Sequence, residues 1–114
     1  MLQHEFIEIR SQDINILLDS NYQDIMLKYD IIVIPDEYVI NNDVLLKGFQ
    51  CDWTYIGNTH EGLAYAGISI IRNEQLYSFI QRIDTYKNHP TLSKLFEMTY
   101  HAIMNNNIII HYGI

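Results

Sequence analysis

The sequence predicts an α+β fold in which helices pack on a mostly antiparallel sheet, within one domain that spans residues 1–114. Three observations predict it: a candidate β-hairpin over about residues 49–71, two apolar stripes at helical spacing over about 73–86 and 91–105, and an apolar strand at about 108–112. A chain of 114 residues has the length of one domain, and folding should bury about two-thirds of its unfolded surface.

The first half of the chain predicts strands and short helices before the hairpin. Strands are indicated by β-branched and aromatic residues, and helices by polar N-cap residues that precede apolar side chains spaced three and four apart. Residues 36–48 fit either a loop or a short helix. The predicted elements are a strand over 5–10, short helices that begin at Ser11 and Asn21, and a buried strand over 29–34 that Pro35 ends.

Turn and cap residues set the limits of the elements in the second half. Residues 57–62, which include Gly57 and Gly62, separate two strand-like segments and therefore predict a hairpin loop. Asn73 stands where an N-cap belongs, before the first apolar stripe. The triplet 105–107 consists of Asn, which tolerates the left-handed conformation that ends helices, so the second helix should stop there.

Charge is distributed unevenly along the chain. Residues 1–57 hold ten Asp and Glu against three Lys and Arg, whereas residues 58–114 hold four of each. The whole formal net charge of −7 therefore belongs to the first half. A one-sided charge produces a directional field that favours basic partners, although acidic side chains also serve solubility alone. Whether this half of the sequence forms one face depends on the fold.

Composition excludes several classes of protein. Seven dispersed cations do not form the basic patch that direct binding to nucleic acid requires. The longest apolar runs, 31–34 and 108–110, are far shorter than a membrane span, and the N-terminus lacks the pattern of a secretory signal. Cys51 is the only cysteine, which excludes an internal disulfide and fits a reducing compartment. We therefore expect a cytoplasmic protein.

No pattern in the sequence predicts a catalytic, cofactor or metal site. The five histidines, His4, His60, His89, His101 and His111, lack the close spacing of zinc ligands. Cys51 lies in a predicted strand beside Asp52, whose charge would raise the pKa of the thiol, so we interpret it as a small buried hydrophobe. A small enzyme remains an alternative, and a cleft that combines His60 or His111 with an acid would support it.

The stretch Gly67-Ile68-Ser69-Ile70-Ile71, followed by Leu76 and Phe79-Ile80, resembles a pattern of bacterial toxin-immunity proteins. The C-terminal stretch 109–114 resembles their short closing strand, so the resemblance covers about the second half of the chain. These are the immunity partners of polymorphic and contact-dependent growth-inhibition toxins. The resemblance implies an inhibitor that occludes the active site of one cognate toxin domain, often a nuclease with a basic cleft. It carries over no catalytic residue.

Charge and composition together predict a small acidic inhibitor that binds a basic protein, with no cofactor and no catalytic residue. Tyrosine suits interfaces, and Tyr22, Tyr29 and Tyr38 lie among the acids. The alternative from another class is a phage or accessory inhibitor that mimics nucleic acid, of the anti-restriction or anti-CRISPR type. Residues that surround the end of the buried strand at Pro35 are the predicted partner-binding site: Asp30, Asp36, Glu37, Tyr38 and Asp43.

Overall fold

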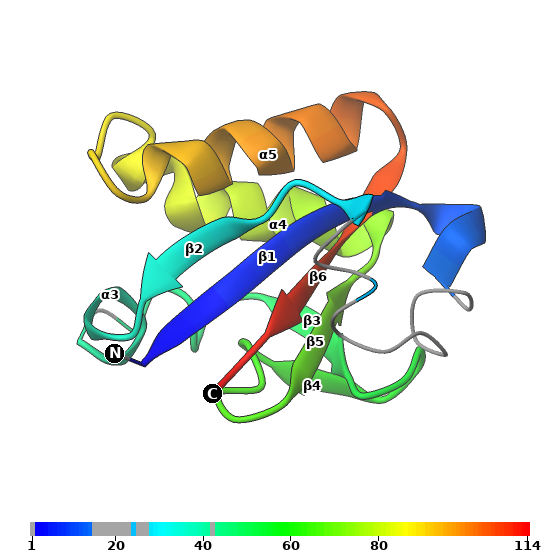
Figure 1. Cartoon of the computed structure of the whole chain (residues 1–114), viewed down its shortest axis with the longest axis horizontal. Coiled ribbons are helices and arrows are strands. Elements are labelled where there is room, and N and C mark those ends of the chain that lie inside the picture. The colour runs from blue at the N-terminus through cyan, green and yellow to red at the C-terminus, as the bar shows by residue number, and fades with distance from the viewer. Residues whose placement is uncertain (1, 15–23, 25–27, 42) are drawn as a thin grey trace.

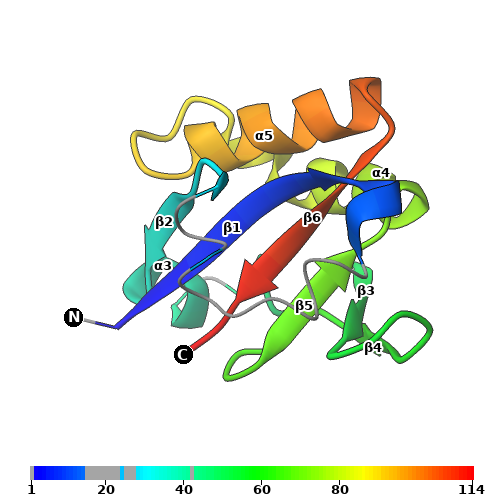
Figure 2. The ribbon, with the colours of Figure 1, turned by 45° about the vertical axis from the view of Figure 1, so that its right-hand side comes forward.

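The computed structural model describes residues 2–14, 24, 28–41 and 43–114. These residues form an α+β fold with a six-stranded antiparallel sheet, which confirms the predicted fold class (Figure 1). The strand order is β2-β1-β6-β5-β3-β4, so the N-terminal and C-terminal strands lie side by side within the sheet (Figure 2). The strands are β1 (Gln3–Arg10), β2 (Ile32–Pro35), β3 (Gln50–Trp53), β4 (Thr59–Glu61), β5 (Ile68–Ile71) and β6 (Asn107–Tyr112).

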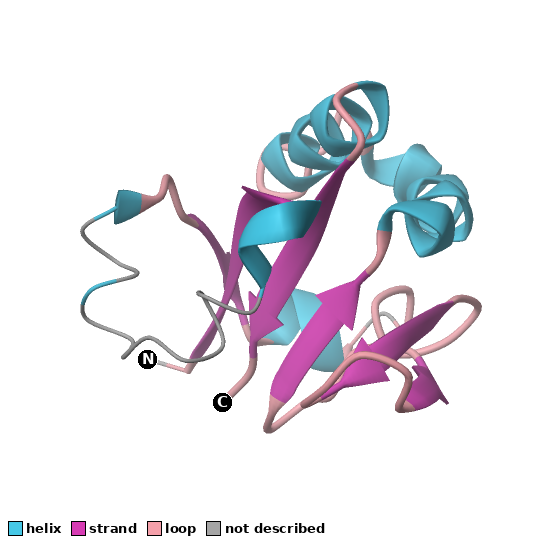
Figure 3. Cartoon of the chain, turned by 90° about the vertical axis from the view of Figure 1, so that its right-hand side faces the viewer, coloured by secondary structure: helices cyan, strands magenta, loops and turns pink. Residues whose placement is uncertain are grey.

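Two helices cover one face of the sheet (Figure 3). The predicted apolar stripes face inward, because Leu76 and Phe79 of the first helix and Leu95 of the second are buried against Phe6 and Ile109 of the sheet. The predicted helices and the final strand are therefore confirmed. The helices are α3 (Glu37–Ile40), α4 (Asn73–Ile83) and α5 (Ser93–Met104), with 3-10 turns at Ser11–Asp13 and Asp84–Tyr86.

The opposite face of the sheet carries a second apolar cluster. Ile7 and Ile9 of β1 lie opposite Ile110 and Ile108 of β6, and all four side chains are buried. Tyr29 and Ile31, which precede β2, pack against this cluster. Because both faces are apolar, the central strand β6 contains a continuous apolar run over 108–110 rather than an alternating pattern.

The predicted hairpin over 49–71 is present but contains three strands instead of two. β3 pairs with β5, as predicted, and also with the short strand β4, which forms within the predicted loop. Gly62 ends β4 with a φ of +74°, where a Cβ would collide with the carbonyl oxygen of Leu46. Glycine is thus required at this point because the two backbones approach too closely for any side chain.

Asn73 does not cap α4, in contrast to the prediction. Arg72 is the N-cap residue, and its backbone N–H donates to the Gln75 side chain at 2.9 Å. The Asn73 amide instead donates to the carbonyl oxygens of Ala102 and Asn107, at 3.3 and 3.0 Å. Asn73 therefore links the start of α4 to the end of α5, a long-range contact that local spacing does not reveal.

The first half of the chain agrees with the prediction only in part where the structure describes it. β1 covers the strand predicted over 5–10, and β2 ends at Pro35 as predicted but begins only at Ile32, so residues 29–31 of the second predicted strand lie outside it. β2 is an edge strand in which only Ile34 is buried, so the prediction of a buried strand was wrong. The ambiguous residues 36–48 contain α3 followed by turns. The helix predicted at Ser11 begins as a 3-10 turn, and its remainder lies outside the described residues, as do most of the helix predicted at Asn21 and Tyr22. None of the helices in the described residues is both long and apolar enough to cross a membrane.

Candidate functional site

Asp36 stands between β2 and α3 and is held by two side chains from distant parts of the sequence. His4 Nε2 donates to Asp36 Oδ1 at 2.9 Å, and the Tyr65 hydroxyl donates to Oδ2 at 2.8 Å. The bond from Tyr65 contributes most to lowering the pKa of the Asp36 carboxyl, followed by the bond from His4, and together they outweigh the partial burial. Asp36 is thus an ionised carboxylate with internal partners.

These bonds continue into a buried chain of hydrogen bonds along the helix-covered face of β1, β6 and β5. His4 Nδ1 lies 2.8 Å from His111 Nε2, and His111 Nδ1 lies 2.9 Å from Ser69 Oγ. The side chains of His4, Ser69 and His111 are fully buried, and the two imidazole rings are nearly parallel. We call this set, Tyr65, Asp36, His4, His111 and Ser69, the histidine chain.

One arrangement of protons satisfies the whole histidine chain with both imidazoles uncharged. Ser69 Oγ accepts the Ala64 N–H at 2.8 Å and donates its own proton to His111 Nδ1. His111 Nε2–H then donates to His4 Nδ1, which leaves His4 Nε2–H for Asp36. Burial, followed by the charge of His4, lowers the pKa of His111 to about 3.

The geometry of the histidine chain favours a structural role over nucleophilic catalysis. A serine next to a histidine is the arrangement that activates a nucleophile, but such a hydroxyl must reach a substrate. Ser69 is fully buried and already accepts a backbone N–H. The histidine chain instead links the β2–α3 junction, through Asp36, to the C-terminal strand β6. Its residues lie far apart in the sequence, and histidines within apolar strands are the only local signal that could have indicated it.

The other predicted site residues lie at two ends of β2. Glu37 is exposed on α3, whereas Tyr38 is half-buried there and packs edge-on against His89. Asp43 is exposed in the turn after α3, with Lys47 Nζ 3.9 Å from its carboxylate. Asp30 precedes β2 and lines a groove at the opposite end of that strand. The structure therefore brings Asp36, Glu37 and Tyr38 together, and it places Asp30 apart from them.

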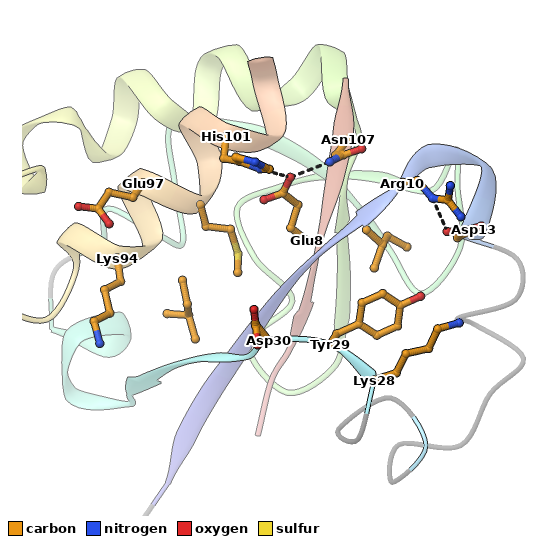
Figure 4. Close-up of a pocket in the computed structure, with 13 residues that line it drawn as sticks. Glu8, Arg10, Asp13, Lys28, Tyr29, Asp30, Lys94, Glu97, His101 and Asn107 are labelled. Carbon is orange, nitrogen blue, oxygen red and sulfur yellow. Dashed lines mark hydrogen bonds and ion pairs between the residues drawn. The ribbon is translucent and has the colours of Figure 1, made fainter. Parts of the chain in front are cut away.

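The groove beside Asp30 has a volume of about 920 Å³ and lies between β1, α5 and the residues that lead into β2 (Figure 4). Glu8 projects from β1 toward α5, where His101 Nδ1 and the Asn107 amide contact its Oε2 at 2.6 and 2.7 Å. Met98 contributes apolar surface, and Lys94 lies on the rim (Figure 4). The groove combines apolar surface with charges of both signs.

Each of the five histidines has a structural contact. His60 stacks on Trp53 with the ring centroids 4.1 Å apart, and His89 Nδ1 accepts the backbone N–H groups of Thr91 and Leu92. His101 contacts Glu8, while His4 and His111 belong to the histidine chain. Within the described part of the sequence, no three His, Cys, Asp or Glu side chains are grouped so that they could hold a metal ion.

Cys51 is fully buried in β3, which confirms its predicted place as a small hydrophobe. Burial is the main cause that raises the pKa of its thiol to about 12, and the charge of Asp52 adds to it. We expect native Cys51 to react with a thiol-specific reagent such as dithionitrobenzoate at least about 100-fold more slowly than after unfolding in urea, because thiolate and access are both lacking. Equal rates in native and unfolded protein would contradict this assignment.

Comparison of the chain with protein-family models, with curated proteins and with solved structures finds no match. The arguments for function therefore depend on the residues and geometry described above.

Proposed function

We propose that this protein is an inhibitor that binds a basic partner protein, in the manner of a cytoplasmic immunity protein that neutralises a toxin domain. The uncompensated negative charge of the first half carries the proposal. Arg10 and Lys47 contact acids within four residues of themselves, Asp13 and Asp43. Glu37 is exposed and makes no ion pair with a described residue. Glu37 therefore presents negative charge that no described cation pairs with.

The most suitable surface for such a partner is α3 with the turn that follows it. Glu37 and Asp43 are exposed there, and Ile40 between them is 53% exposed. We call Glu37, Ile40 and Asp43 the α3 surface. An apolar side chain flanked by charges is a common arrangement at protein interfaces, where the apolar group packs and the charges select the partner. Asp36, bound within the histidine chain, holds the start of α3 in place.

The proposed mechanism is electrostatic occlusion of a basic cleft. Carboxylates of the α3 surface, together with Asp30 at the opposite end of β2, would take the place of substrate phosphates in such a cleft. Long-range attraction between opposite charges raises association rates by roughly 10- to 1,000-fold at low salt. Inhibition by this route needs no catalytic residue in the inhibitor.

The proposal is tested by recovering the partner from the native host by affinity pull-down and measuring association kinetics with the purified partner. We expect the association rate of the unsubstituted protein to fall by at least about tenfold between low and high salt. Glu37→Gln with Asp43→Asn should lower the low-salt rate severalfold. The matched control is Glu74→Gln with Asp84→Asn, which removes two exposed charges from the second half. A salt-independent rate, or equal losses in both double variants, would refute the electrostatic mechanism.

A further inference from the structure

Among the described residues, half of β1 has no neighbouring strand on the side that faces β2. β1 spans Gln3–Arg10, and β6 pairs with it as far as Arg10. β2 pairs only with residues 3–6 of β1. Before Ile32 the chain leading into β2 does not pair with β1: Tyr29 and Ile31 pack against the apolar cluster on the opposite face of the sheet, and Tyr29 also lines the groove beside β1. Among the described residues, no strand continues the sheet beside residues 7–10 of β1.

The hydrogen-bond alternation of the sheet shows which backbone groups this edge presents. Asp36 N–H donates to the Leu2 carbonyl at 3.1 Å, and this contact extends the register of β1 and β2. In antiparallel pairs every second residue bonds to a given neighbour, so even-numbered residues of β1 face β2 and odd-numbered ones face β6. The N–H and C=O groups of Glu8 and the N–H of Arg10 therefore point away from β6, toward the uncovered side.

The groove described above lies along this uncovered edge. Glu8 and Arg10 line it from β1, Met98 and His101 line it from α5, and Ile32 lines it at the start of β2 (Figure 4). It therefore continues the line of β2 beyond Ile32, the first residue of that strand. Backbone donors and acceptors beside an apolar floor are the features by which a sheet edge recognises an extended peptide.

We propose that the edge of β1 at Glu8 and Arg10 receives an extended segment of a partner polypeptide, which adds a strand in line with β2. The proposal deepens the proposed function, on which it rests for the partner being a protein. Main-chain hydrogen bonds at Glu8 and Arg10 provide the affinity. Apolar side chains of the segment pack on Met98 and Ile32. Asp30 and Lys94, on the rim of the groove, interact with charged residues of the segment on either side of these apolar side chains.

A second copy of this chain does not suit the edge strand β2. The backbone groups of Pro35 lie on the side of β2 that faces away from β1, and proline has no N–H to donate there. Asp36 follows Pro35 directly. In an antiparallel pair of two β2 strands, the acids before and after the strand would lie opposite one another, and such like-charge pairs are destabilising. The outer edge of β2 is therefore protected against pairing with a second copy. The edge of β1 at Glu8 and Arg10 is a different edge, which lies within the groove.

Arg10→Pro removes one backbone donor from the proposed site with little effect on the fold. Arg10 has φ −70° and ψ 144°, a conformation that proline adopts, and its N–H is not used by β6. The matched control is Arg10→Ala, which loses the same side chain and its exposed contact with Asp13 but keeps the N–H. Denaturant unfolding should show both variants folded with similar stability.

The probe is an acetylated, amidated peptide of alternating threonine and valine with a lysine at each end, titrated to millimolar concentration and followed by amide NMR. Binding should shift the Glu8 and Arg10 amides and slow their hydrogen exchange. Arg10→Ala should bind like the unsubstituted protein, and Arg10→Pro at least about fivefold more weakly, the typical effect of one hydrogen bond. A copy of the peptide N-methylated at its central residues should not bind.

Several outcomes would overturn the proposal. These are absence of shifts, shifts confined to other strands, equal binding of the N-methylated peptide, equal affinity of the two Arg10 variants, or slow exchange of the Glu8 and Arg10 amides in the free protein. A concentration-dependent dimer in sedimentation, with these amides protected, would assign the edge to a second copy instead. Because the probe does not include the native partner, failure here leaves the salt dependence at the α3 surface as a separate test of the proposed function.

Discussion

Asp52→Ala is expected to lower the free energy of unfolding by about 3–5 kcal/mol, the usual cost of removing one partner from a buried charged network. Asp52 is fully buried in β3. Its Oδ2 accepts the Gly57 backbone N–H at 2.7 Å and Arg72 Nε at 2.8 Å. Its Oδ1 accepts the Thr59 hydroxyl at 2.8 Å and the Gln75 amide at 3.1 Å. One carboxylate thus joins the β3–β4 turn to the start of α4.

The measurement is urea unfolding followed by circular dichroism, with Asp84→Ala as the matched control. Asp84 is an exposed acid on the turn after α4, and its nearest cation, Lys87, is 3.9 Å away. An exposed pair of this kind contributes little, so the control should lie within about 0.5 kcal/mol of the unsubstituted protein. Equal effects of the two substitutions would show that the Asp52 network does not hold the turn against α4.

Asp52 also sets the expected response to strong acid. Burial alone would raise the pKa of its carboxyl, but the hydrogen bonds from Gly57, Thr59, Gln75 and Arg72 together lower it below the usual value. The folded state therefore binds this proton less readily than the unfolded state. Its contribution to stability is present above the unfolded pKa of about 3.9 and is lost as the pH falls through the folded value.

The second large effect is expected from His111 in moderate acid. Unfolded histidine takes up a proton near pH 6.5, whereas folded His111 does so at about pH 3. Between these values the unfolded state binds more protons, so stability rises with pH and falls on acidification. For one group the slope is at most about 1.4 kcal/mol per pH unit. Over the full window the loss amounts to several kcal/mol.

This prediction is checked by unfolding free energies measured at intervals from about pH 7 down to about pH 4.5, where exposed carboxylates remain mostly ionised. His111→Gln should be less stable at neutral pH but should lose stability more slowly on acidification, because the titrating imidazole is gone. Ser69→Ala is the matched control, since it removes a hydrogen-bond partner of His111 yet keeps the imidazole. Identical slopes for the unsubstituted protein and His111→Gln would contradict the assignment.

These two networks show that two acids of the first half have partners within the fold. Of the acids in the first half, Asp52 is used to fix a turn, and Asp36 anchors the histidine chain. The charge available to a partner is accordingly smaller than the −7 of the sequence indicates. What remains at the Pro35 end of β2 is the α3 surface, which local sequence signals did not distinguish from Asp36.

Much of the fold could be predicted because its signals are local. The stripe that includes Leu76 and Phe79 repeats at helical spacing, and its burial requires only a sheet to pack against. The turn residues between Gly57 and Gly62 similarly predict a reversal of the chain. Details that depend on tertiary contacts were missed. The strand β4 forms because Gln50–Asp52 of β3 pairs with it. Asn73 does not act as the N-cap of α4 because its amide instead donates to a carbonyl near the end of α5.

The sequence by itself determined the α+β class, the two long helices, the closing strand and the excess of acid in the first half, since each follows from neighbouring residues. Only the tertiary structure decided which acids are available and where the sheet is open. His4 and His111 are 107 residues apart, and they meet because β1 pairs with β6. Within the described parts of the chain, no strand lies beside Glu8 and Arg10 on the β2 side, because β2 is shorter than β1. Strand pairing joins residues across the chain, and no local periodicity records which strands pair or where their pairing ends.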